Sequence, residues 1–193
     1  MKLVPTGSQT VGPFFHLGLD RPDWYDLTAG GKAAGEKIVI EGHVFDGDGA
    51  PVPDALLEIW QANAAGRYAH PEDTQDKPLD RHFRGFGRAK TDAEGRYRFL
   101  TIRPGPVPGR GNTLQAPHIA MTIFGRGLLK HLFTRLYFAG EALNKTDPVL
   151  GSLEDPALRN TLLAEPAGKN GVSTLYRFEI VLQGKGETVF FDV

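Results

Sequence analysis

The segment "QAPHIAMTIFG", residues 115–125, places a single histidine where a pair could bind a metal ion. Its pattern is that of a strand, so His118, Ala120, Thr122 and Phe124 share one face. Neighbours on one face are ~7 Å apart, so imidazoles spaced i, i+2 can converge on one ion. The second position here is Ala120, whose methyl group donates nothing. The segment therefore predicts half of a metal-binding pair.

Short alternating segments must position this histidine. Seven or more short strands are predicted, among them residues 37–46, 54–63, 96–102, 118–125, 131–138 and 176–184. Turns rich in Gly, Asp and Pro separate them, in keeping with 24 glycines and 14 prolines.

One segment, "EDPALRNTLLAEP", breaks the strand pattern and predicts a short helix. Asp155 is a suitable N-cap, Pro156 fits the first helical position, and Pro166 ends the run. Leu158 and Leu162 are four residues apart and predict one apolar side.

These elements predict an all-β chain, an antiparallel β-sandwich with an extended N-terminal arm and one short helix. A chain of 193 residues fits a single domain, residues 1–193. Residues 1–36 have weak periodicity and two Gly- or Pro-rich stretches, so we expect an arm that lies over its own domain or a neighbour.

The composition excludes several classes of function. The 22 basic and 23 acidic residues nearly cancel, which gives no indication of nucleic acid or an anionic membrane as a partner. The chain has no cysteine, which excludes disulfides and thiolate metal sites. The first 15 residues contain no long apolar run, so we expect neither a signal peptide nor a membrane span, but a cytoplasmic protein.

Four segments in matching order and spacing resemble the intradiol ring-cleaving dioxygenases. They are "GHVFDGDGAPVPDALLEIWQANAAGRY", "TDAEGRYRFLTIRPGPVP", "APHIAMTIFGRG" and "RLYF". The stretches "SQTVGPFFH" and "ETVFFD" are similar to the α chains of the family's two-chain members. The resemblance implies a β-sandwich fold and a β chain as partner, with the catalytic ferric iron, Fe(3+), bound by that β chain.

The family's iron site uses two tyrosines and a His-x-His pair. Tyr68 in "AAGRYAH" matches the first tyrosine, but Val107 stands in the loop that carries the second. His118 matches one histidine, and Ala120 replaces the other. A ferric ion needs several oxygen and nitrogen donors to be held against water. We therefore predict that this chain binds no metal and has no catalytic residue of its own.

The resemblance also implies substrate-binding residues. In the two-chain members the α-chain arm, here Thr10, Gly12 and Pro13, reaches the rim of the β chain's pocket. Their substrate, 3,4-dihydroxybenzoate, is cleaved with O2 to 3-carboxy-cis,cis-muconate. Arg126, in a Phe-Gly-Arg-Gly turn, is the expected partner of the substrate carboxylate, and Arg135 is the rival candidate.

Structural roles for these residues, and two other classes of function, stay open. His118 is also typical of a structural histidine beside a carbonyl, and Tyr68 of a packed core tyrosine. A self-sufficient enzyme would need further ligands beside Tyr68 and His118, with His70 or His82 as candidates. A non-enzymatic binding module on the same fold is the third possibility.

Overall fold

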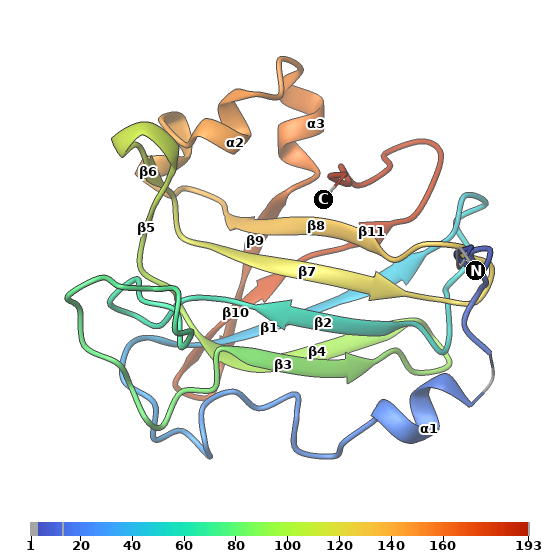
Figure 1. The fold of residues 1–193 in the computed structure, drawn as a ribbon, viewed down its shortest axis with the longest axis horizontal. Helices are drawn as coiled ribbons and strands as arrows, with labels where there is room; N and C mark the ends of the chain where they lie inside the picture. The colour runs from blue at the N-terminus through green and yellow to red at the C-terminus, as the bar shows by residue number, and fades with distance from the viewer. Residues whose placement is uncertain (1–3, 13, 193) are drawn as a thin grey trace.

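The computed structural model describes residues 4–12 and 14–192, most of them in strands and loops (Figure 1). The elements in chain order are α1 (Phe15–Leu19), β1 (Lys37–Phe45), β2 (Leu56–Trp60), β3 (Phe86–Lys90), β4 (Arg96–Ile102), β5 (Val107–Pro108), η1 (Arg110–Asn112), β6 (Leu114–Gln115), β7 (His118–Phe124), β8 (Leu132–Phe138), η2 (Ala142–Lys145), α2 (Pro148–Gly151), α3 (Pro156–Asn160), β9 (Leu163–Asn170), β10 (Ser173–Arg177) and β11 (Ile180–Val181).

Within the described residues, nine strands form one hydrogen-bonded sheet that nearly closes on itself. Its order is β11-β1-β10-β9-β8-β7-β2-β3, and β4 pairs with β1. Strand β9 joins two parts of the sheet: its start pairs with β8 and the rest pairs with β10. The chain is therefore mostly β, and the division into two sandwich layers remains a prediction.

The core lies between the parts of this curved sheet. Alternation directs one set of side chains inward from each strand. The fully buried members include Ile38 and Ile40 of β1, Phe99 of β4, Leu57 and Ile59 of β2, Ile119 and Met121 of β7, and Leu136 and Phe138 of β8. Burial of these side chains supplies the main driving force for folding and leaves the opposite face of β7 free for polar residues.

The sheet is mixed rather than purely antiparallel. Strands β10 and β11 run parallel to β1, and β9 runs parallel to β8. The prediction of an antiparallel sheet was therefore wrong in part. A parallel pair needs a long crossover, and residues 139–162, which contain η2, α2 and α3, provide one between β8 and β9.

The described residues form three short α-helices rather than one. The predicted start of α3 is confirmed, since Asp155 caps it through the N–H of Ala157 at 2.8 Å and Pro156 is its first residue. The predicted end was wrong, because β9 already begins at Leu163 and includes Pro166. Pairing with β8 and complete burial of Leu162 outweigh the local preference for helix.

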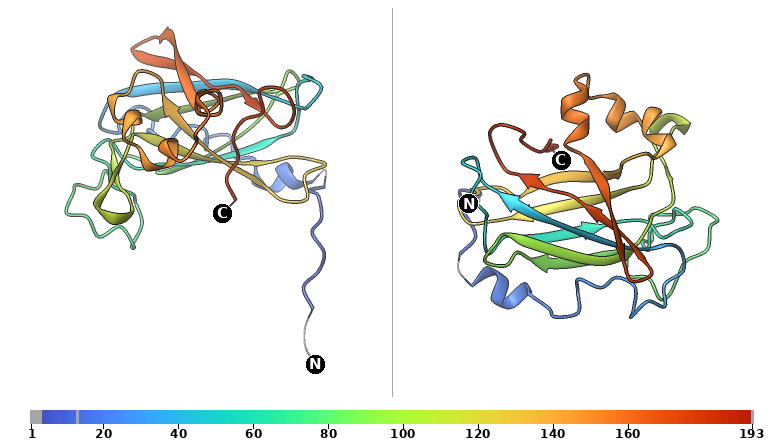
Figure 2. Two further views of the ribbon diagram at one scale, coloured as in Figure 1. Left: turned by 90° about the horizontal axis from the view of Figure 1, so that it is seen from above. Right: turned by 180° about the vertical axis from the view of Figure 1, so that it is seen from behind.

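The N-terminal region divides into two parts. Residues 4–12 are mostly exposed and extend away from the body of the molecule (Figure 2). Leu27 and Ala33, by contrast, are buried, and the N–H of Leu27 donates to the carbonyl of Leu100 at 2.8 Å. The later part of the predicted arm thus packs on its own domain, and contact of residues 4–12 with a partner remains a prediction.

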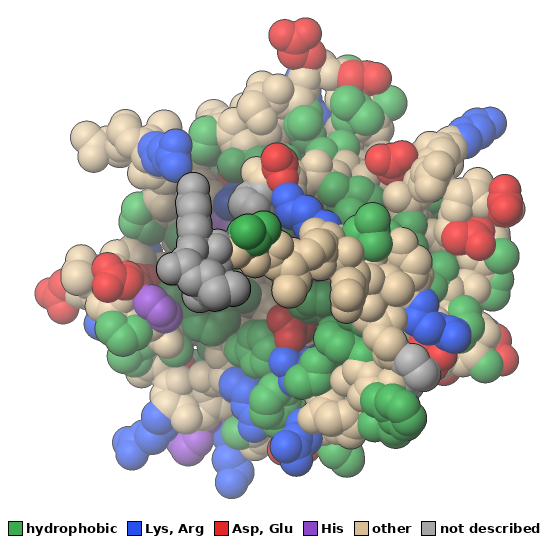
Figure 3. All heavy atoms as spheres, turned by 45° about the vertical axis from the view of Figure 1, so that its right-hand side comes forward, with side chains coloured by type: hydrophobic (Ala, Val, Ile, Leu, Met, Phe, Trp, Pro, Cys, Tyr) green, Lys and Arg blue, Asp and Glu red, His purple; other side chains and the backbone are tan. Residues whose placement is uncertain are grey.

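The surface that carries the N-terminal segment mixes both signs of charge with exposed hydrophobic side chains (Figure 3). Val4, Phe14 and Leu17 are among the exposed hydrophobic residues, at 84%, 78% and 70% exposure. Across residues 4–12 and 14–192, no helix combines the length and apolar character needed to cross a bilayer.

Candidate functional site

One face of β2, β7 and β8 carries the side chains around His118, the single histidine of the expected pair. Trp60 on β2 lies opposite Ala120 on β7, and Ala120 lies opposite Arg135 on β8. His118 lies opposite Tyr137, and their ring centroids are 5.6 Å apart. Directly paired residues share a face of a sheet. The five side chains therefore form one surface at the start of β7.

Two loops border this surface, residues 61–85 after β2 and residues 103–106 after β4. The first of them carries Tyr68. The Tyr68 ring stacks on Trp60 with centroids 5.8 Å apart. Gly66 lets the two loops meet, since its φ is +77° and a Cβ there would lie 2.1 Å from the Pro106 carbonyl oxygen. The loops border a shallow, open hollow of about 610 Å³ lined by Trp60, Tyr68, His70, Glu72, Asp73, Thr74, Gln75, Val107 and Pro108.

His118 is buried and hydrogen-bonded, as a structural histidine would be. Its Nδ1 lies 2.8 Å from the carbonyl oxygen of Ala116, so the ring donates there. Burial first, and then the charge of Arg135, lower the pKa of His118 from 6.5 to about 4. The Ala116 bond and the charge of Asp147 act in the opposite direction. His118 is therefore neutral at physiological pH.

The lowered pKa of His118 predicts acid sensitivity. The unfolded chain binds a proton near pH 6.5 and the folded chain only near pH 4, so stability falls as pH drops through this window. The loss reaches about 3 kcal/mol at most. His118→Gln should flatten the dependence of the unfolding free energy on pH between pH 7 and 4, while the exposed control His82→Gln should not. An equally steep dependence in His118→Gln would contradict this origin.

A polar network surrounds Arg135. Its Nη1 donates to Gln115 Oε1 at 2.7 Å and lies 3.4 Å from the hydroxyl of Tyr137. That hydroxyl donates to the buried carboxylate of Asp147 at 3.2 Å. Burial raises the pKa of Tyr68, and the charge of Arg135 opposes this rise. One guanidinium thus acts on both Tyr68 and His118.

The donors at this face do not fit a ferric ion. Tyr68 and His118 are present, but Val107 and Ala120 offer only hydrocarbon where the family pattern has a phenolate and an imidazole. Arg135 adds a positive charge on the same face. Among the described residues, no group of three or more His, Cys, Asp or Glu side chains could hold a metal ion.

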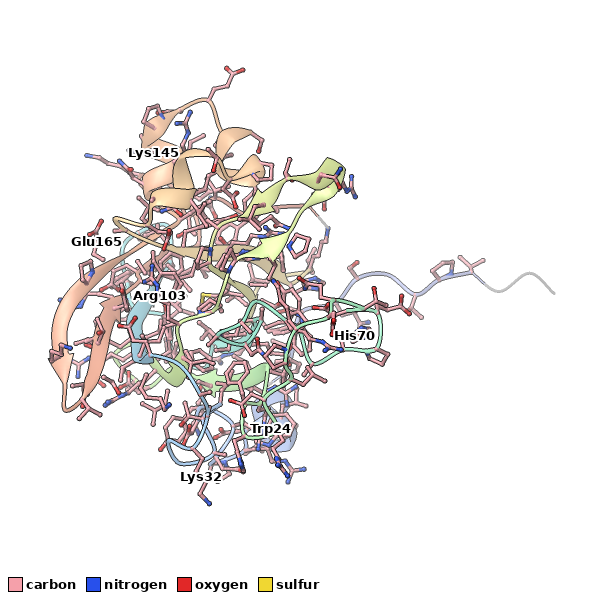
Figure 4. The ribbon with its side chains drawn as sticks, turned by 90° about the vertical axis from the view of Figure 1, so that its left-hand side faces the viewer. Trp24, Lys32, His70, Arg103, Lys145 and Glu165 are labelled. Atoms are coloured by element: carbon pink, nitrogen blue, oxygen red, sulfur yellow. The ribbon has the colours of Figure 1, made fainter. Side chains whose placement is uncertain are left out.

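Of the two further histidines considered as ligands, His70 lines the hollow beside Tyr68, whereas His82 does not. His70 is exposed and lies on the loop after β2, at the edge of the molecule (Figure 4). Its Nδ1 accepts the N–H of Glu72 at 3.2 Å. His82 is exposed as well, and its backbone N–H donates to Asp80 at 2.8 Å.

The predicted substrate-binding residues gather at the other end of β7. The Thr10 hydroxyl oxygen accepts the N–H of Gly127 at 2.7 Å, directly beside Arg126. Arg126 Nη2 lies 3.1 Å from Asp54 Oδ2, and both side chains are exposed. The Gly12 carbonyl accepts the N–H of Phe15 at 3.1 Å.

Pro13, the fourth predicted residue, lies outside the described residues. The arm and the turn are nevertheless neighbours, since the rings of Phe15 and Phe124 are 5.4 Å apart. His118 and Phe124 are six residues apart on one strand, a span of ~20 Å. The Thr10 and Arg126 cluster therefore cannot serve the face around His118.

Sequence reasoning gave no role to Trp60 and Tyr137 on this face, nor to Gln115 and Asp147, which hydrogen-bond to Arg135 and Tyr137 respectively. Asp147 precedes Pro148, and its side chain accepts the N–H groups of Val149 and Leu150 as the N-cap of α2. The Asp-Pro pair is the same helix-start signal that identified α3. Nothing local in the sequence indicates that Trp60 lies opposite Ala120 or that Gln115 contacts Arg135.

A second hollow, of about 910 Å³, lies over the exposed side of β1 and β4. Much of its charge is compensated within the chain. The ion pairs at this hollow include Lys90 with Asp20, Arg88 with Glu58 and Arg177 with Glu41. It shares no lining residue with the hollow at Tyr68.

The chain is similar to known proteins over most or all of its length. The α chain of protocatechuate 3,4-dioxygenase from Pseudomonas putida is 42% identical over 205 residues, which cover 100% of this chain and 98% of that one. The β chain from Burkholderia cepacia is 41% identical and covers 94% of this chain and 77% of its own length.

Structural similarity extends over the whole fold. The dioxygenase domain of a carbohydrate-binding protein fusion from Streptomyces sp. SirexAA-E matches with a TM-score of 0.64 and 30% identity, covering 94% of this chain and 99% of that one. The family model described as "Dioxygenase" matches residues 12–184. Together with the full-length similarity to protocatechuate 3,4-dioxygenase chains, this match confirms that the chain belongs to the intradiol ring-cleaving dioxygenases.

Proposed function

We propose that this chain is the non-catalytic α-type subunit of a cytoplasmic protocatechuate 3,4-dioxygenase. The assembled enzyme would cleave 3,4-dihydroxybenzoate with O2 between its two hydroxyl-bearing carbons to give 3-carboxy-cis,cis-muconate. The observation that carries the proposal is the loss of two donors, at Val107 and Ala120, in a chain that is otherwise similar to both chain types.

The iron of the enzyme then belongs to a β-type partner chain. The family is iron-dependent, and a ferric ion supplies the activation of the bound catechol. The face around His118 cannot hold that ion, because Val107 and Ala120 provide no donor atoms at two ligand positions. The guanidinium of Arg135, opposite Ala120, adds a positive charge. What remains for this chain is to bind the partner and to shape its pocket.

The Thr10 and Arg126 cluster is the proposed wall of the partner's pocket. The Arg126–Asp54 pair is exposed, and exposed pairs contribute little, so the guanidinium can turn toward a substrate carboxylate. Thr10, Gly12 and Pro13 would present backbone and an apolar ring to the substrate. Exposed Val4, Phe14 and Leu17 support a partner surface here, since apolar side chains gain from being covered.

Reconstitution tests the proposed function. The chain, expressed alone and mixed with iron, should not consume O2 with 3,4-dihydroxybenzoate. Co-expression with a β-type chain that carries a His-x-His strand should give a stable complex with ring-cleavage activity and iron bound only to the partner. Replacing the partner's His-x-His pair should abolish activity, whereas Tyr68→Phe in this chain should preserve it. Activity of the chain alone, or a lone monomer beside the β-type chain, would overturn the proposal.

A further inference from the structure

The position of Arg135 is set by the strand pairing. Arg135 lies directly across from Ala120, whose side chain is a single methyl group. A small residue at that point leaves room for the long arginine side chain to extend over β7. Its guanidinium reaches Gln115 at 2.7 Å, the residue that pairs with Val107 in the short β5–β6 ladder. Arg135 thus lies opposite one position that lacks a donor and contacts the strand partner of the other.

The charge of Arg135 is balanced within the same network. The guanidinium contacts the Tyr137 hydroxyl at 3.4 Å, and that hydroxyl donates to Asp147 at 3.2 Å. Asp147 is 1% exposed and also accepts the N–H of Ala116 at 2.7 Å. A buried carboxylate needs a cation or several donors nearby, and Arg135 is the cation that this network contacts. The face therefore contains a built-in positive charge with its own counter-charge.

We infer that the Arg135 guanidinium takes the place of a metal ion on this face, and that it excludes ferric iron even where the missing donors are restored. The repulsion between a guanidinium and a trivalent ion in a partly buried site is strong. A histidine at position 120 would meet the Arg135 side chain directly across the strands. The arginine at position 135 therefore requires a small residue such as Ala120. All of these contacts lie within this chain.

Restoring the donors tests the inference. The double variant Val107→Tyr/Ala120→His is compared with triple variants that add Arg135→Gln or, as a matched control, Arg126→Gln. Each is incubated with ferric citrate and desalted, then assayed for iron and for visible tyrosinate-to-iron absorption. The Arg135→Gln triple variant should retain at least about tenfold more iron than the other two. Equal retention in the double variant and the Arg135→Gln variant would overturn the inference, with the proposed function unaffected.

A metal-free measurement covers the case in which the multiple variants do not fold. Ala120→His alone should lower the Tm, because the new imidazole meets Arg135. Adding Arg135→Gln should recover much of that loss, which gives a coupling between the two sites in a double-mutant cycle. Purely additive Tm changes would show that the two positions do not share the space and would overturn the inference.

Discussion

Arg126→Ala in the assembled two-chain enzyme should weaken use of 3,4-dihydroxybenzoate far more than use of catechol. Loss of a charge-assisted pair to the substrate carboxylate costs about 1.5–3 kcal/mol, or roughly 10- to 150-fold in kcat/KM. Catechol has no carboxylate and should lose little. The comparison is made as the ratio of kcat/KM values for the two substrates at constant ionic strength.

Two further variants locate the effect. Arg98→Ala removes an exposed arginine from β4 and should leave the substrate ratio unchanged. Deletion of residues 1–13 removes Thr10, Gly12 and Pro13, so it should alter the preference among substituted catechols without removing the partner's iron. Equal losses for both substrates in Arg126→Ala would refute the assigned role.

Asp147→Ala should be strongly destabilising, by about 3–5 kcal/mol. The carboxylate caps α2 and accepts hydrogen bonds from Ala116 and Tyr137, and its removal leaves both buried donors without a partner. Equilibrium denaturation in urea measures the loss as a shift of the midpoint.

Asp155→Ala is the matched control. Asp155 also caps a helix, but it is exposed, and its carboxylate accepts a single N–H among the described residues, that of Ala157. Its loss should cost about 1 kcal/mol. Similar losses for the two variants would show that the buried network around Asp147 adds nothing beyond a helix cap.

Much of the fold could be predicted because local signals agree with tertiary packing. The alternation in β1, β4 and β7 matches the buried faces found, and Tyr176, Phe178 and Ile180 are all buried as their spacing predicts. Strand β9 was missed because six of its eight residues are exposed and it contains proline and glycine. Its position depends on pairing with β8 and β10, which no local pattern encodes.

As with the fold, only part of the site could be predicted from the sequence. The missing donors at Val107 and Ala120 follow from the family pattern alone. The role of Arg135 does not, because it depends on the cross-strand pairing of β7 with β8 and on the loop that brings Gln115 within reach. Arg135 was expected as a rival for the substrate carboxylate; it lies opposite Ala120 and beside Tyr137, at the other end of β7 from Arg126, and the choice between the two arginines stays a prediction.

Metal analysis of the separately purified chain, after incubation with iron and desalting, tests the central claim most directly. We predict a colourless protein whose iron content is far below one equivalent, since too few side chains at the Tyr68 and His118 face can bind the ion. A stoichiometric ferric centre with tyrosinate charge-transfer absorption would contradict the account.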